Sequence, residues 1–201
     1  MKNIKTLKVI YLCALLSLCF NIGLYGYSIK LKEEYNRASI LIDKNQYKKA
    51  ISVYQDMLKS GFELSEHMKS RIYNNLGYCY YKLKNLEDAY RFYTKALEID
   101  GSYFFCLNNI SAVLIKQKKY QEALPYLNRA FDLDKEYIKV VFNLFVVQAN
   151  LKSENLAEYY LKKAFEIDKD YTIERLRKNN ISDKQIEKII KRLDSKENND
   201  K

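Results

Sequence analysis

A pattern that recurs every 34 residues limits the folds available to this chain more than any other feature of its sequence. Its clearest mark is the set Ala89, Ala123 and Ala157. In the first copy, Tyr93 and Ala96 follow at positions i+4 and i+7, which places the three side chains on one face of a helix. The other two copies keep this spacing of apolar residues. A period of this length indicates a tandem array of similar units, none of which can bury its apolar face alone.

A second helical pattern precedes each leading alanine, so every unit is expected to be a pair of helices. The three patterns read Tyr73-x-x-Leu76-Gly77-x-x-Tyr80, Leu107-x-x-Ile110-Ser111-x-x-Leu114 and Val141-x-x-Leu144-Phe145-x-x-Gln148. An earlier unit contains Ala50 and Tyr54 in a similar arrangement, but Ala50 lies 39 residues before Ala89. The difference from the usual period predicts an insertion at about 61–66.

Composition supports a helical fold and argues against an enzyme. One proline and five glycines in 201 residues are too few turn formers for a sandwich, a barrel or a hairpin-rich fold. Hydrophobic residues make up 48% of the chain, enough to fill a core. The chain has one histidine, His67, and no glycine-rich phosphate loop or metal-ligand spacing. We therefore expect no catalytic residue, no metal site and no cofactor.

The two-helix units resemble the tetratricopeptide repeat family, whose pattern is W-x2-L-G-x2-Y, then A-x3-F and a further A, within one period. The resemblance implies an all-α fold: a right-handed superhelical solenoid of about four repeats, with capping helices at its C-terminal end. The repeat domain is expected at 31–171, with units at about 31–69, 70–103, 104–137 and 138–171.

Two residues depart from the family pattern or test it. Phe145 stands where a small side chain is usual, which predicts shifted helix packing in the fourth unit. Pro125 falls early in a second helix, where its missing N–H costs little.

The C-terminal part of the chain is expected to cover the last repeat. Ser182-x-x-Gln185 has the form of a capping box and leads into an apolar helical stripe that begins at Ile186. Residues 172–193 are therefore expected to form capping helices, and residues 194–201 a disordered tail.

An uncharged stretch from Val9 to Ile29 precedes the repeats. Its 21 residues would span roughly 31 Å as a helix, close to the hydrocarbon thickness of a bilayer. We expect residues 1–30 to be an uncleaved anchor of a single-pass membrane protein, with the repeats outside the cytoplasm, although basic residues on both flanks leave the orientation open. The alternatives are a cleaved signal peptide, a lipoprotein modified at Cys19 and a buried core helix.

The net charge of +10 gives no sign of a nucleic-acid partner. Residues 31–171 carry 22 basic and 19 acidic side chains, so most of the excess lies in the two ends of the chain. A nucleic-acid binder usually concentrates Lys and Arg on its folded domain. No nucleic acid is therefore expected.

Cys79 and Cys106 are expected to be free thiols. In the repeat register they are offset along neighbouring helices by seven residues, about 10 Å, which is beyond disulfide reach once the lateral helix spacing is added.

The resemblance also implies a binding surface, because the first helix of each pair lines the groove in that family. The candidate groove residues are Asn36, Asn74, Asn75, Tyr78, Phe105, Asn108, Asn109, Lys139, Phe142 and Asn143. A ladder of amides can pair with the backbone of an extended peptide while aromatic rings cover its side chains. The equally weighted alternative is that the asparagines form helix-to-helix hydrogen bonds. The family's carboxylate clamp is not supported, since fewer than half of its positions match.

The sequence therefore predicts a membrane-anchored scaffold or adaptor that binds protein or peptide partners in a concave groove and has no catalysis of its own. Neither a nucleic acid nor a small-molecule substrate is expected. Two alternatives stay open: a regulatory or nucleic-acid-associated helical repeat, and an accessory subunit of an enzyme complex.

Overall fold

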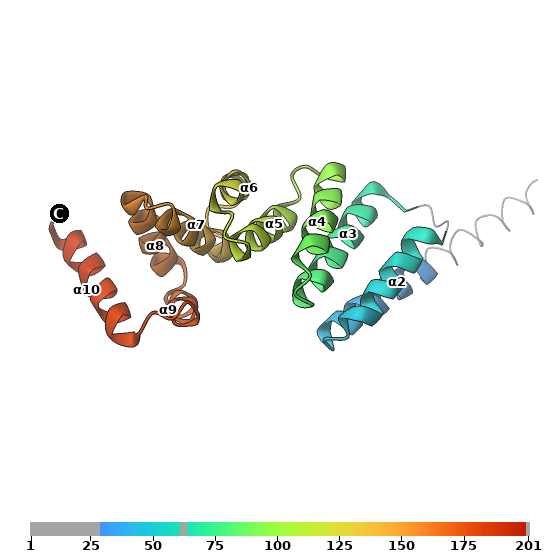
Figure 1. Ribbon diagram of the computed structural model, residues 1–201, viewed down its shortest axis with the longest axis horizontal. Helices are drawn as coiled ribbons and strands as arrows, with labels where there is room; N and C mark the ends of the chain where they lie inside the picture. Colours follow the sequence, from blue (N-terminus) through green and yellow to red (C-terminus); the bar gives the residue numbers. More distant parts are fainter. Residues whose placement is uncertain (1–28, 61–63, 200–201) are drawn as a thin grey trace, which may run out of the picture.

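The computed structural model describes residues 29–60 and 64–199, which fold entirely into helices and short turns (Figure 1). A helix at 29–43 comes first. The helices that follow are α2 (Tyr47–Lys59), α3 (Glu66–Lys82), α4 (Leu86–Ile99), α5 (Phe104–Lys116), α6 (Tyr120–Leu133), α7 (Ile138–Asn150), α8 (Glu154–Ile167), α9 (Lys169–Lys178) and α10 (Asp183–Asn199). The predicted fold class, an all-helical solenoid of two-helix units, is confirmed.

The helices pair as the repeat period requires. The first helices of the units are the one at 29–43, α3, α5 and α7, and the second helices are α2, α4, α6 and α8. Within a unit, α3 packs against α4, α5 against α6 and α7 against α8. Each of α2, α4 and α6 then contacts the first helix of the next unit. The units therefore stack in chain order.

The stack is curved, with the first helices on its inner side. α3 contacts α5 and α5 contacts α7, whereas no comparable contact joins α4 to α6 or α6 to α8. Elements that approach one another lie on the inside of a bend, so the first helices line the concave surface. Figure 1 shows the resulting arch, which runs from α2 at one end to α10 at the other.

Small residues allow the two helices of a unit to approach closely. Gly77 faces the ring of Tyr93, and a Cβ atom at this position would lie 2.6 Å from the Tyr93 Cδ1 atom. The equivalent Ser111 is buried and its hydroxyl donates to the Asn108 carbonyl at 2.7 Å. In the fourth unit Phe145 takes this position and borders a cleft of about 360 Å³ between α7, α8 and α10. The helix packing therefore leaves a cleft beside Phe145, which is the bulkiest of the three residues at this repeat position.

The turn inside each unit contains one residue in the left-handed region of backbone space. Lys84, Lys118 and Lys152 have φ angles of 64°, 61° and 60°, and Asn45 in the first unit has 57°. Glycine and asparagine adopt this conformation readily, whereas a lysine there costs about 1 to 2 kcal/mol because of its Cβ atom. Three turns of the solenoid therefore contain local backbone strain.

Helices α9 and α10 cover the end of the fourth unit. Leu176 of α9 and Ile186 of α10 are 1% and 3% exposed, in a buried cluster that includes Leu161 of α8. The side-chain oxygen of Gln185 accepts a hydrogen bond from the Ser182 backbone N–H at 3.0 Å, which is one half of the predicted capping box. The apolar face of α8 is therefore protected from water.

Helix α10 continues past the boundary predicted at Leu193 and ends at Asn199. The expectation of a disordered tail is therefore corrected for residues 194–199, which are helical. Neither glycine nor proline occurs between Asp183 and Asn199, so nothing in the local sequence ends the helix earlier.

The predicted localisation as a single-pass membrane protein with extracytoplasmic repeats is wrong for this structure. Within residues 29–60 and 64–199, no helix is both long enough and apolar enough to cross a bilayer. The apolar helices α5 and α7 have 13 residues each, whereas a span needs about 20. Residues 9–28 of the segment expected to be the anchor lie outside the described residues.

Candidate functional site

Asparagines of successive first helices are hydrogen-bonded to each other along the concave surface. The side-chain amide of Asn109 donates to the Asn74 side-chain oxygen at 3.0 Å, and that of Asn143 donates to Asn108 at 3.2 Å. These bonds join α3 to α5 and α5 to α7. Asn74, Asn108 and Asn143 are only 7%, 8% and 9% exposed. The asparagine ladder therefore exists, and it connects neighbouring helices.

Asn75 makes a different connection, from α3 back to the first unit. Its amide donates to the hydroxyl groups of Tyr35 at 3.0 Å and Tyr54 at 2.9 Å. Tyr54 is fully buried, and this burial raises the pKa of its hydroxyl to about 12. Asn36, the first member of the predicted series, lies exposed on the helix at 29–43.

Phe142 ends the ladder. It occupies in α7 the position that Asn74 and Asn108 hold in α3 and α5, and its side chain is fully buried. The Tyr171 ring of α9 lies 6.3 Å from the Phe142 ring, and the Arg175 guanidinium lies 5.4 Å above it. Phe142, predicted as a groove residue, is thus covered by α9 in this structure.

Four rings gather where the third and fourth units meet, and we call Tyr103, Phe104, Phe105 and Tyr137 the aromatic cluster. Phe105 is 52% exposed, and its ring lies 6.2 Å from Tyr103, 5.4 Å from Phe104 and 6.3 Å from Tyr137. All three contacts are edge-to-face, the arrangement that aromatic quadrupoles favour. The cluster leaves an apolar surface open to water on the first-helix side.

Cationic side chains lie over aromatic rings along the same first helices. The pairs are Arg71 over Tyr35 at 5.1 Å, Lys82 over Tyr78 at 5.8 Å, Lys116 over Tyr81 at 5.0 Å and Lys139 over Tyr137 at 5.9 Å. Of these four cations, Lys139 alone was among the residues predicted from the sequence. A usable signal was present, because Arg71, Phe105 and Lys139 are separated by one repeat period each, as are Lys82 and Lys116.

Arg175 extends this series onto α9. Its Nε atom is buried and has no hydrogen-bond partner among the described residues. Burial raises the pKa of Tyr81 in α3, and the Arg175 guanidinium partly offsets that rise. The third and fourth units separate Tyr81 from Arg175 in the sequence, so the charge of Arg175 reaches back to the second unit.

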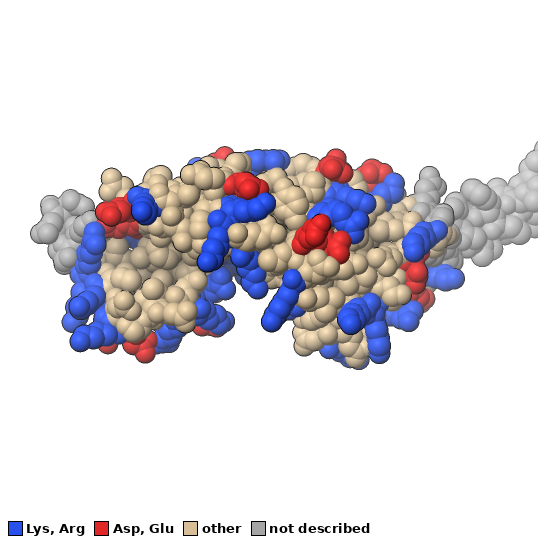
Figure 2. Space-filling view, viewed as in Figure 1, with Lys and Arg blue, Asp and Glu red and all other residues tan. Residues whose placement is uncertain are grey.

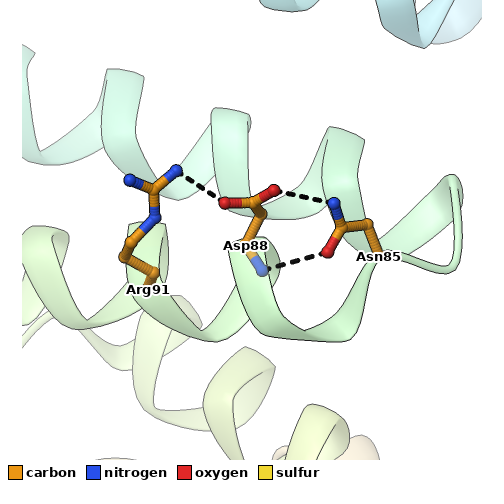
Figure 3. A network of polar contacts seen from close by, with 3 residues as sticks. All are labelled: Asn85, Asp88 and Arg91. Carbon is orange, nitrogen blue, oxygen red and sulfur yellow. Dashed lines mark hydrogen bonds and ion pairs between the residues drawn. The ribbon is translucent and has the colours of Figure 1, made fainter.

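The described residues show no site for a metal ion. No group of His, Cys, Asp and Glu among them is arranged to hold a metal ion. Asp88 lies in the first turn of α4, and its backbone N–H donates at 3.1 Å to the side-chain oxygen of Asn85, which caps the helix (Figure 3). Its carboxylate accepts from the Asn85 amide at 2.7 Å and pairs with Arg91 at 2.6 Å. This carboxylate stabilises a helix end.

Comparisons with known proteins agree with the fold. Residues 68–136 match one family model of the tetratricopeptide repeat, and residues 35–60 match another. A segment of MamA from Desulfovibrio magneticus RS-1 has a similar structure, with a TM-score of 0.65 and 16% identity over 81% of this chain and 94% of that chain. YrrB, described as a TPR protein with an unusual peptide-binding site, has a TM-score of 0.61 and 20% identity over 74% of each chain. At these identities the similarity shows a shared fold.

A curated relative matches a shorter part of the chain. The uncharacterized protein ycf37 of Porphyra purpurea is 29% identical over 85 residues, which are 40% of this chain. The match covers 49% of that protein, so the chain spans about half the length of the relative.

Proposed function

Starting from the tetratricopeptide repeats that this chain carries at residues 35–60 and 68–136, we propose that it is a non-catalytic scaffold that binds an extended peptide segment of a partner protein on its concave surface. The observation that supports this most directly is the aromatic cluster, where Phe105 exposes 52% of its surface on the first-helix side. Exposed aromatic rings lose unfavourable contact with water when a partner covers them, which is why they are common at binding sites.

The asparagine ladder supports the same proposal. A side-chain amide has two donor hydrogens and an oxygen with two lone pairs, and the ladder uses one donor of Asn109. Asn75 and Asn109 are half-buried, so part of each side chain remains accessible to a ligand. The two interpretations of the asparagines are therefore compatible: they join the helices and can also pair with a peptide backbone.

YrrB, the structurally similar protein described as having a peptide-binding site, provides a precedent for this use of the fold. A peptide partner is also supported, without that likeness, by the exposed Phe105 ring and the half-buried Asn109 amide of α5.

The proposal can be tested with a displayed library of random dodecapeptides selected on the full chain. We expect selected peptides to lose affinity by about tenfold or more when Phe105 is replaced by Ala, because the exposed ring is removed from the contact. Isothermal titration with synthetic copies of those peptides measures the change.

Tyr159 provides a matched control, because it is aromatic and 53% exposed but lies on α8, a second helix. The Tyr159→Ala variant should bind the same peptides as the unmodified chain does. Equal losses in both variants, or selected peptides indifferent to Phe105→Ala, would place the binding surface elsewhere and refute the proposal.

A further inference from the structure

Charged residues are divided between the two sides of the solenoid. In α3, α5 and α7, Glu66 is the one acidic residue, and it pairs with Lys69 at 2.7 Å. The second helices contain most of the acids of these units: Glu87, Asp88, Glu98, Glu122, Asp132, Glu154, Glu158 and Glu166. The first helices of the second to fourth units therefore have an excess of basic residues, although the repeats as a whole are nearly neutral.

Two rows of cations run along this concave side, one on each side of the asparagine ladder. Arg71 and Lys139 lie near the N-terminal ends of their helices, at the repeat position that Phe105 holds between them. Lys82 and Lys116 are the last residues of α3 and α5. All four cations are exposed, and none of the ion pairs among the described residues includes them.

The four cationic groups contact aromatic rings and are not paired with carboxylates in the described part of the chain. Each of the four lies within 6 Å of a tyrosine ring centre, and this contact orients an ammonium or guanidinium group without neutralising its charge. Arg175 adds a further cation at the C-terminal end, over Phe142. Figure 2 shows Lys and Arg side chains around the hollow on the lower side of the arch.

We propose that the peptide bound on this surface is acidic, with Asp or Glu side chains paired to the two cation rows and an apolar side chain on the aromatic cluster. This inference rests on the proposed function and adds the charge of the ligand to it. Ring-oriented cations without carboxylate partners need no rearrangement to accept those carboxylates, so electrostatic complementarity favours an acidic segment over a neutral one.

The spacing of the first helices suits an extended chain. Neighbouring helices pack about 8 to 10 Å apart, and an extended polyproline-type peptide advances about 9 Å in three residues. Acidic side chains three residues apart would therefore meet successive first helices. A nucleic acid fits less well, because the repeat domain has 22 basic and 19 acidic residues and thus little long-range attraction for a phosphate backbone.

The test compares two double variants that change the net charge equally. Lys116→Glu with Lys139→Glu reverses one cation in each row, whereas Lys49→Glu with Lys95→Glu reverses two exposed cations on the second helices α2 and α4. The probes are dodecapeptides selected on the full chain, the same peptides with Asp and Glu replaced by Asn and Gln, and a twelve-nucleotide thymidine oligonucleotide.

We expect the selected peptides to be enriched in Asp and Glu. Their affinity for the unmodified chain should fall about tenfold or more when Asp and Glu are replaced by Asn and Gln. The unchanged peptides should also bind the Lys116→Glu, Lys139→Glu variant about tenfold or more weakly. The control variant should retain most of the affinity. Circular dichroism melting of both variants confirms that each is folded before binding is compared.

Two results would overturn the inference, and each has a different consequence for the proposed function. Peptides that require Phe105 but show no acidic excess would keep the binding groove and remove the preference for acids. An oligonucleotide that binds through Lys116 and Lys139 more tightly than any selected peptide would identify the concave surface as a nucleic-acid site. If no selected peptide depends on Phe105, the proposed function itself fails.

Discussion

The side-chain amide of Asn109 in α5 donates a hydrogen bond of 3.0 Å to the side-chain oxygen of Asn74 in α3. The two residues are 35 positions apart, one more than the repeat period. Asn109 therefore bonds to Asn74 and not to Asn75, which holds the equivalent position in the preceding unit. The same relationship joins Asn143 to Asn108 in the next unit. A bond repeated in this way fixes the position of one unit on the other along the inner side of the curve.

Replacing Asn109 by Ala should lower the free energy of unfolding by about 1 to 3 kcal/mol, because the Asn74 oxygen loses its partner in a residue that is only 7% exposed. Urea denaturation followed by circular dichroism measures the loss. Asn36→Ala is the control, since Asn36 is exposed, and its effect should be small. Unchanged stability in Asn109→Ala, with weaker peptide binding alone, would show that the amide serves the ligand and not the fold.

Replacing Gly77 by Ala should destabilise the second unit by about 1 to 3 kcal/mol, because the new Cβ atom would meet the Tyr93 ring at 2.6 Å and the buried ring has little room to move. Thermal melting of the full chain gives the measurement. Gly101→Ala is a matched control, since its nearest atoms are 3.9 Å away and ordinary contact results. A Gly77→Ala protein as stable as the Gly101→Ala protein would mean that α3 and α4 can separate at no cost.

Replacing Lys118 by Gly should raise the free energy of unfolding by about 1 kcal/mol, because φ is 61° at this position and glycine has no Cβ atom to strain. The opposite sign is expected for Lys95→Gly, since Lys95 lies inside α4, where glycine costs about 1 kcal/mol. Urea midpoints of the two variants give the comparison. Destabilisation by both substitutions would show that the Lys118 side chain has a stabilising role beyond its backbone conformation.

Burial raises the pKa of the Cys79 and Cys106 thiols from 9.0 to about 12. A folded-state pKa above the unfolded value favours the protonated thiol, so this contribution to stability is complete below about pH 9 and is lost as the pH rises towards 12. We expect the free energy of unfolding to fall through that window. At about pH 8 both thiols should resist iodoacetamide in the folded chain and react in guanidinium chloride. Peptide mass mapping of each cysteine checks this, and rapid labelling of the folded protein would contradict it.

The helix pairs could be predicted because the same pattern occurs repeatedly. Ala89, Ala123 and Ala157 recur at a fixed spacing because they hold the same position in successive units, and all three are buried. The asparagine ladder was also visible in the sequence. The partner of each amide was not, because Asn74 and Asn75 are adjacent and the superhelical offset between units decides which of them meets Asn109.

Other features depend on contacts between distant residues. Arg71 and Lys116 look like ordinary surface cations in the sequence, and only the structure shows that each lies over a ring contributed by another segment of the chain. The burial of Phe142 depends on α9, whose position follows from the packing of Leu176 and Thr172 on the fourth unit. Spacing within a single helix gives no information about such contacts.

The aromatic residue at position 142 also decides where the array can be lengthened. A duplicate of residues 104–137 inserted after residue 137 would bring a further Asn108 and Asn109, so the added Asn109 amide would find the Asn108 oxygen on the preceding helix. A duplicate of 138–171 inserted after residue 171 would set its Asn143 counterpart against Phe142, which offers no acceptor. The solenoid is thus extensible by engineering at one internal junction and closed to growth at its C-terminal end.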